Sequence, residues 1–114
     1  MSMNELHPRV EAILSISRAL WGQVTPELRA VFGQLGPKSL NVTMIFEGEI
    51  TDDLREIASE VEGYVIADYP DVFTIAVDAV RLDPPPRSKT IIPPDADWSN
   101  IVWVYERREP DLDG

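Results

Sequence analysis

Apolar residues recur at spacings of three and four residues over the stretch 9–22, and this pattern predicts an amphipathic helix. Pro8 is suited to the first turn of that helix, and Gly22 is suited to its end. One face of the helix should pack against the rest of the protein. The residues that we expect on this buried face are Val10, Ile13, Leu14, Ser17, Leu20 and Trp21.

A second stripe of the same period predicts a helix over residues 52–68. Thr51 is a natural N-cap, and Asp52 and Asp53 follow it where the helix dipole favours negative charge. The helix should end before Pro70, because the residue that precedes a proline is disfavoured in helical geometry. The residues expected on its buried face are Leu54, Ile57, Ala58, Val61 and Val65.

Four further runs have the composition and alternation of β-strands. The first lies around residues 28–32 and precedes a predicted turn over 33–38, which is rich in Gly and Pro. The second follows this turn, the third covers 72–82, and the fourth covers 100–108. The alternation places Val42, Met44 and Phe46 opposite Thr43, Ile45 and Glu47 in the second strand, and it places Ile101, Trp103 and Tyr105 on one face of the fourth.

The order of these elements is α-β-β-α-β-β, and it predicts an α+β fold. Short links between the strands favour a four-stranded, mainly antiparallel sheet with two helices packed on one face. The opposite face carries residues such as Thr43, Ile45 and Thr74, and we expect it to be partly open.

Length and composition agree with a packed globular protein. A chain of 114 residues with 44% hydrophobic residues can bury one modest core. We expect a single domain over 1–114, with frayed ends at 1–7 and 110–114 and a long Pro-rich loop over 83–97. No apolar run approaches a membrane-spanning length, and residues 1–10 contain no apolar signal core. The expected location is therefore the cytoplasm, without a membrane partner.

Negative charge is concentrated in one stretch of the chain. Residues 47–71 contain nine carboxylates against Arg55 alone, so they carry −8 of the formal net charge of −10. These acids form either a helix face that is only solvated or a docking surface for a partner. A face that is only solvated usually has Lys residues among its Glu residues, and this stretch has none. The one-sided charge fits a basic protein partner and disfavours direct binding of nucleic acid. The nine are Glu47, Glu49, Asp52, Asp53, Glu56, Glu60, Glu62, Asp68 and Asp71.

The sequence matches no catalytic or cofactor-binding motif. The chain has no cysteine, and its one histidine, His7, has no partner for a zinc site or a catalytic triad. Carboxylates at Glu47, Glu49, Asp52 and Asp53 could supply oxygen ligands to a hard cation, but their spacing does not match a calcium loop. We therefore expect no enzyme activity, no cofactor and no bound metal.

Trp98 is the aromatic candidate for contact with a partner. It lies between the Pro-rich loop and the fourth strand, where it would anchor either the loop or a partner. Trp103 and Tyr105 are more typical of core packing than of a binding cage. The residues predicted to bind a partner are therefore Glu47, Glu49, Asp52, Asp53, Glu56, Glu60 and Trp98.

Three stretches of the chain, SRALWGQVTPELRAV, FEGEITDDLREIASEVEGYVIADYP and WVYERRE, carry a resemblance to a known family. The chain resembles small, single-domain bacterial proteins of the polymorphic toxin and contact-dependent inhibition immunity type. Their pattern is a helix ending in R-A-L-x-G-x-V-x-P-x-L-R, then F-[DE]-G-E, an acidic helix and V-I-A-D-[FY]. The resemblance covers residues 17–71 and 101–109, implies no catalytic residues, and does not extend to the Pro-rich loop.

Two functions from different classes follow from this sequence. The resemblance implies an immunity protein, which would neutralise a cognate basic toxin domain through the acidic surface, with a nuclease as the toxin class that suits it best. The alternative is a small interaction or structural module without a toxin partner. Such a module would pair with a second copy through an exposed strand or the open sheet face.

Overall fold

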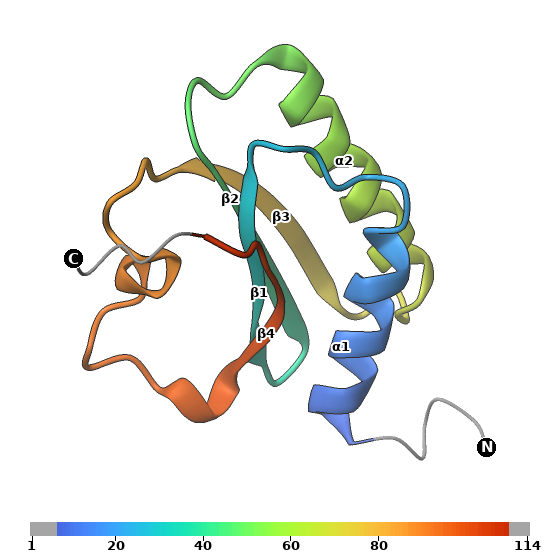
Figure 1. Cartoon of the computed structure of the whole chain (residues 1–114). Helices are drawn as coiled ribbons and strands as arrows, with labels where there is room; N and C mark the ends of the chain where they lie inside the picture. The colour runs from blue at the N-terminus through green and yellow to red at the C-terminus, as the bar shows by residue number, and fades with distance from the viewer. Residues whose placement is uncertain (1–6, 110–114) are drawn as a thin grey trace.

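The helices and strands follow one another in the predicted order (Figure 1). The computed structural model describes residues 7–109, so the predicted frayed ends, apart from His7, lie outside the described residues. No helix in this part of the chain is long and apolar enough to cross a membrane. The elements are α1 (Pro8–Ala19), β1 (Leu28–Gly36), β2 (Ser39–Phe46), α2 (Asp52–Ala67), β3 (Thr74–Arg81) and β4 (Ile101–Glu106), with 3-10 turns at Ser88–Ile91 and Trp98–Asn100.

The four strands form one sheet in the order β3-β2-β1-β4. Strand β1 is antiparallel to both of its neighbours, whereas β2 pairs in parallel with β3. The parallel pair follows from α2, because parallel neighbours need a crossover connection and this helix provides it. The prediction of an α+β fold with a mainly antiparallel sheet and two helices on one face is confirmed.

The helix α2 forms where the sequence predicts it. Thr51 Oγ1 accepts a hydrogen bond from the Leu54 amide at 3.2 Å, and Asp68 is the C-cap. Four of the five expected core residues are buried, and Ile57 is half-buried. The row of apolar residues at spacings of three and four thus attaches α2 to the sheet.

The helix α1 buries a different face from the one that the sequence predicts. Val10 and Leu14 are 45% and 42% exposed and Trp21 is 89% exposed, so the prediction of a buried stripe through them is wrong. The helix also ends at Ala19, before the predicted end at residue 22. Small side chains dominate the face that is buried, and they let the helix lie close to the sheet. The buried residues are Ala12, Ser15, Ile16 and Ala19.

Gly33 lies inside a strand and not in a turn. The predicted turn over 33–38 is wrong, because β1 continues to Gly36 before a two-residue turn leads into β2. A Cβ atom at position 33 would lie 3.1 Å from Ile16 Cδ1 and 3.1 Å from Leu40 Cδ1. The glycine therefore makes room for α1 on the strand.

The Pro-rich segment covers the middle of the sheet face opposite the helices (Figure 1). Ile45 is fully buried beneath it, so the prediction that this residue lies on an open face is wrong, although Thr74 is exposed. The physical reason is a second apolar cluster, which the segment completes with its own side chains. The buried members of this cluster are Ala30, Phe32, Ile45, Ile92 and Ile101.

An irregularity in β4 separates two aromatic residues that were expected on one face. Val31 pairs with Tyr105 and Phe32 pairs with Trp103, so β4 has one more residue than β1 between these pairs. Trp103 packs against Phe32 under the Pro-rich segment, with 5.0 Å between the ring centroids. Tyr105 packs against the helix-side core instead, so the prediction of a shared face is wrong.

Replacing Leu54 with alanine should destabilise the fold. The side chain is 5% exposed in the helix-side core, so its loss removes buried apolar surface and leaves a cavity. We expect the free energy of unfolding in urea to fall by about 2–4 kcal/mol. Val72→Ala is the control, because Val72 is 60% exposed and its loss should change stability by less than about 0.5 kcal/mol. Equal losses for the two variants would contradict the placement of α2.

Candidate functional site

Six carboxylates line an open groove of about 700 Å³ at one end of the molecule. One wall comes from the loop before β1 and from the residues that follow β2. The other wall is the first half of α2. The carboxylates are Glu27, Glu47, Glu49, Asp53, Glu56 and Glu60, and we call this site the acidic groove.

Local sequence explains how α2 presents its acids to the groove. Gly48 adopts a φ of 81°, which turns the chain out of β2 before Thr51 caps the helix. Asp53, Ile57 and Glu60 then follow at spacings of four and three, so they lie along one side of the helix. This side borders the apolar face, and the groove therefore has a partly apolar floor at Ile57 beneath its acids.

The acids of the groove differ in how far they are already neutralised. Glu47 forms an ion pair with Arg107, and Glu60 accepts a hydrogen bond from Gln23 Nε2 at 2.9 Å. In contrast, Glu49, Asp53 and Glu56 form no ion pair with any residue of the described range 7–109. These last three carboxylates are exposed, and a cationic partner can reach them.

The structure brings together five of the seven residues that were predicted to bind a partner. Glu47, Glu49, Asp53, Glu56 and Glu60 all line the acidic groove. Asp52 does not line it, although it neighbours Asp53 in the sequence. Its side chain is fully exposed and forms an ion pair with Arg55 at 3.2 Å.

Trp98 lies at the other end of the sheet. The 3-10 turn Trp98–Asn100 leads into β4, where Ile101 pairs with Gln34 near the end of β1. The acidic groove adjoins the opposite end of β1, where Leu28 pairs with Phe46. Figure 1 shows this turn at the bottom of the view and the connection from β2 to α2 at the top. Trp98 and the groove therefore do not form one continuous site.

Glu27 is a member of the groove that the sequence does not indicate. It is distant in sequence from the acidic stretch and reaches the groove through strand pairing. The backbone N–H of Glu47 donates to the Glu27 carbonyl at 2.9 Å, next to the pair formed by Leu28 and Phe46. A contact of this kind depends on the register of two strands, and no local motif signals it.

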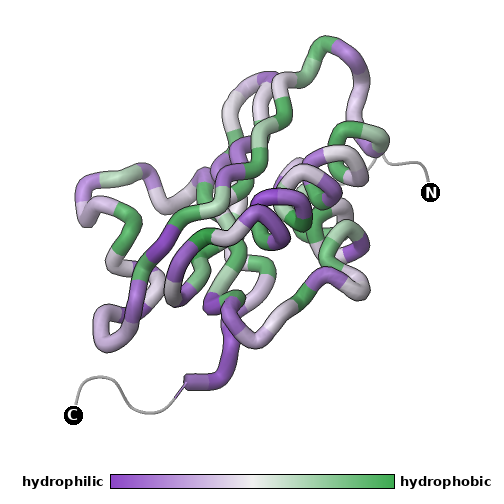
Figure 2. The backbone as a smooth tube through the Cα atoms, turned by 90° about the horizontal axis from the view of Figure 1, so that it is seen from above, coloured by the Kyte–Doolittle hydropathy of each residue, from purple (hydrophilic) through white to green (hydrophobic). Residues whose placement is uncertain are grey.

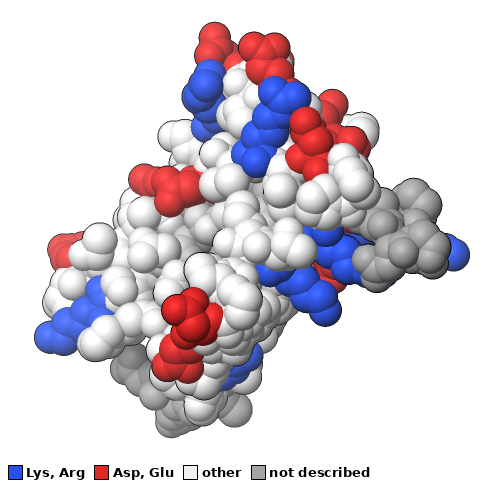
Figure 3. Space-filling model, turned by 90° about the vertical axis from the view of Figure 1, so that its left-hand side faces the viewer, with Lys and Arg blue, Asp and Glu red and all other residues white. Residues whose placement is uncertain are grey.

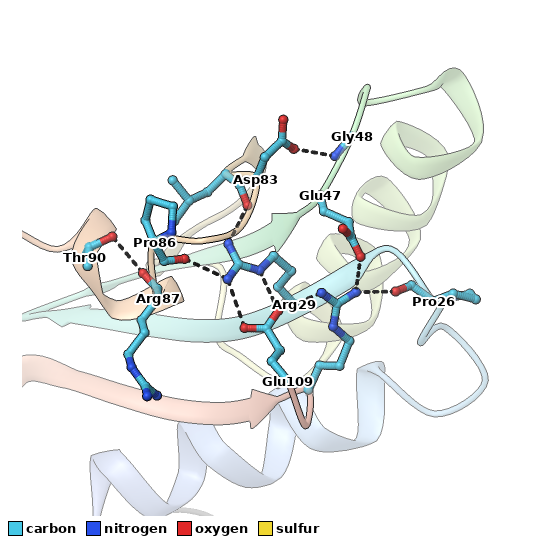
Figure 4. Close-up of polar contacts among 11 residues, drawn as sticks. Pro26, Arg29, Glu47, Gly48, Asp83, Pro86, Arg87, Thr90 and Glu109 are labelled. Atoms are coloured by element: carbon cyan, nitrogen blue, oxygen red, sulfur yellow. Dashed lines mark hydrogen bonds and ion pairs between the residues drawn. The ribbon is translucent and has the colours of Figure 1, made fainter. Parts of the chain in front are cut away.

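A buried arginine, Arg29, lies in β1 close in sequence to the groove residue Glu27 (Figure 4). The side chain of Arg29 is 0% exposed. It donates hydrogen bonds to the Leu82 carbonyl at 2.6 Å, to the Pro86 carbonyl at 2.8 Å, and to both carboxylate oxygens of Glu109 at 2.7 and 2.9 Å. Strand β1, the start of the Pro-rich segment and the chain after β4 are thus joined at one point.

Arg107 extends this arrangement to the groove. Its guanidinium donates to the Pro26 carbonyl at 2.7 Å, to Glu109 at 2.6 Å and to Glu47. Figure 2 shows the hydrophilic run 106–109, which leaves the sheet before the C-terminus and supplies Arg107 and Glu109. We call the four residues Arg29, Glu109, Arg107 and Glu47 the ion-pair clamp. The clamp fixes the side chain of Glu47 at the groove.

A second connection joins the groove to the Pro-rich segment. Asp83 accepts a hydrogen bond from the Gly48 backbone N–H at 2.7 Å and forms an ion pair with Arg81 at 2.9 Å. The hydrogen bonds from Arg81 and from Gly48 hold the pKa of Asp83 below its ordinary value. The hydrogen bond to Asp83 therefore fixes the backbone of the β2–α2 turn at Gly48.

No group of three or more Asp, Glu or His residues within 7–109 is placed to hold a metal ion. Seen from the side on which the Pro-rich segment lies, the middle of the surface is mostly uncharged, and bases lie among the acids at the top, the end at which β2 leads into α2 (Figure 3). In the acidic groove, by contrast, carboxylates gather from three segments.

Comparison with known proteins identifies a family. Residues 9–109 match the family model described as MafI2 immunity protein. The match spans nearly all of the described chain and agrees with the resemblance to bacterial immunity proteins. No curated protein shows a significant match to the sequence.

The ion-pair clamp should make the fold sensitive to acid. The hydrogen bonds from Arg29, together with Arg107, hold the pKa of Glu109 below its ordinary value of 4.5. A lowered pKa in the folded state contributes stability that is complete above the ordinary pKa and is lost as the pH falls through the folded pKa. We therefore expect the free energy of unfolding to decrease as the pH falls below 4.5.

Glu109→Gln should remove much of this dependence. At pH 7 the variant should lose about 3–5 kcal/mol, because Arg29 is left without its buried counter-charge. Urea unfolding at neutral and acidic pH measures both effects. Glu106→Gln is the matched control, because Glu106 is exposed and lies three residues away. An identical pH dependence in wild type and Glu109→Gln would contradict the role of the clamp.

Proposed function

Because the chain belongs to the MafI2 immunity protein family, we propose that it neutralises its toxin by placing the acidic groove on a basic surface of the toxin domain. The observation that carries this proposal is the convergence of six carboxylates from three segments in one groove. Binding of this kind blocks the toxin by covering a surface, and it requires no catalysis by the immunity protein.

The uncompensated acids give the groove its affinity for cations. Within residues 7–109 no base forms an ion pair with Glu49, Asp53 or Glu56, although Arg81 is near enough to Glu49 to act on it electrostatically. Lys or Arg side chains of a partner would pair with these carboxylates, and the field of the groove would accelerate the encounter. The free energy gained on binding thus comes from charges that the folded chain leaves unpaired.

A nuclease is the toxin class that this groove fits best. The active surface of a nuclease must carry clustered Lys and Arg to hold phosphates. A groove lined by carboxylates presents negative charge to that surface as a nucleic acid does, and therefore competes with the substrate. Direct binding of nucleic acid to the immunity protein itself is disfavoured by the same charge.

Pairing of two copies through the β3 edge of the sheet has less support. The open side of β3 is partly occupied, because Glu62 Oε2 accepts a hydrogen bond from the Val77 backbone N–H at 3.1 Å. Asp78 is exposed on the same strand and adds a charge to that edge. Both features oppose the addition of another strand.

Charge reversal in the groove tests the proposal. The variant Asp53→Lys/Glu56→Lys raises the formal net charge from −10 to −6 and should preserve the fold, because both residues are exposed. Association with the purified, catalytically inactivated toxin domain should slow about 10- to 100-fold at low salt and should depend less on salt concentration. Protection of cells from the active toxin should weaken in parallel.

A matched variant separates the groove from net charge. Asp71→Lys/Asp95→Lys changes the charge by the same amount at exposed positions outside the groove, and it should bind with nearly the wild-type rate. Unchanged association and protection in a folded Asp53→Lys/Glu56→Lys variant would exclude the groove as the docking site. Failure of nucleic acid to compete for the toxin would exclude a nuclease surface as the target.

A further inference from the structure

Trp21 is the most exposed large apolar residue in the described part of the chain, at 89%. It follows Leu20, the C-cap of α1, and precedes Gly22, whose φ of 76° turns the chain towards β1. A tryptophan in water contributes almost nothing to the hydrophobic core, so folding does not explain it. Tryptophan is, however, the residue most enriched among the anchors of protein interfaces.

The position of Trp21 relates it to the acidic groove. Two residues later, Gln23 donates its side-chain hydrogen bond to Glu60, which lines the groove. Thr25, a further two residues along, lines the groove itself. Val24, between them, is 47% exposed. The loop that carries Trp21 is therefore attached to the groove through Gln23 and enters its lining at Thr25.

This loop is held in place by its own backbone. The N–H of Trp21 donates to the Arg18 carbonyl at 3.2 Å, and the N–H of Gln23 donates to the Leu20 carbonyl at 2.9 Å. An anchor on a constrained loop loses less conformational entropy on binding than one on a flexible loop.

A second exposed aromatic residue lies near the C-terminal end of α2. Tyr64 is 60% exposed. It follows Glu60 by four residues, so it continues the row of Asp53, Ile57 and Glu60 along one side of the helix. Trp21 and Tyr64 therefore lie on two segments that the hydrogen bond from Gln23 to Glu60 joins: Trp21 on the loop, and Tyr64 on the helix one turn beyond the last acid of the groove.

We propose that Trp21, supported by Val24 and Tyr64, is the apolar anchor of the toxin-binding surface and inserts into an apolar pocket beside the cationic surface of the toxin domain. This inference rests on the proposed function. The carboxylates then govern how fast the complex forms, and Trp21 governs how long it lasts.

A toxin domain fits this surface better than a second copy of the chain. Two copies that met through Trp21 would bring two acidic grooves together, each on a chain with a net charge of −10, and would repel one another. A partner with basic side chains around an apolar pocket satisfies both the carboxylates and the tryptophan. Self-association of the free protein through Trp21 would overturn the choice of partner.

The test compares binding kinetics of two tryptophan variants with the inactivated toxin domain. Trp21→Ala should have the same urea midpoint of unfolding as the wild type. Its complex should dissociate roughly 30-fold faster, with little change in the association rate or in the salt dependence of that rate. Trp98→Ala is the matched control. It removes the same side chain at the opposite end of the sheet and should leave both rates unchanged. Trp21→Phe should retain part of the slow dissociation.

The outcomes separate this inference from the proposed function. If Asp53→Lys/Glu56→Lys slows association while Trp21→Ala dissociates at the wild-type rate, the anchor is refuted and the groove stands. If Trp21→Ala accelerates dissociation while the charge-reversed variant associates normally, the groove is refuted and Trp21 is confirmed as a contact. A loss of binding in Trp98→Ala alone would refute both and would place the interface at the other end of the sheet.

Discussion

A buried cation organises one side of this protein. The guanidinium of Arg29 is removed from water, and such a charge is tolerated only when acceptors surround it. Its acceptors come from two segments distant in sequence, the carbonyls of Leu82 and Pro86 and the carboxylate of Glu109. The Pro-rich segment and the chain after β4 therefore meet β1, and the second apolar cluster is closed over the sheet.

The same interaction divides the negative charge of the groove into two kinds. Through Arg107, the clamp neutralises Glu47 and makes it part of the framework. The acids on α2 are placed by a local helix with its own N-cap, and they do not need the clamp. Charge that stabilises the fold and charge that remains for a partner thus line one groove: Glu47 belongs to the first kind, and Glu49, Asp53 and Glu56 belong to the second. A surface built in this way can be both rigid and strongly attractive to cations.

Close packing of α1 has a comparable consequence for the apolar surface. Small side chains on its inner face and Gly33 beneath it bring the helix close to the sheet. The larger residues Val10, Leu14 and Trp21 are then left on the outside. Apolar surface that a looser helix would have buried is therefore available for contact, and Trp21 lies on the loop that Gln23 joins to the groove residue Glu60.

The sequence by itself determined the order of the elements, the whole of α2 and the acids along it, because helix periodicity, capping and charge spacing act over a few residues. It did not determine which face of α1 is buried. Both the row of small side chains and the row of large apolar side chains have the helical period, and the contact of α1 with Gly33 favours the small ones. Nor did the sequence place Glu27 in the groove, or Arg29 and Glu109 together. Those contacts depend on strand register and on the path of the Pro-rich segment, which follow from burying one charge and one apolar cluster among residues far apart in the chain.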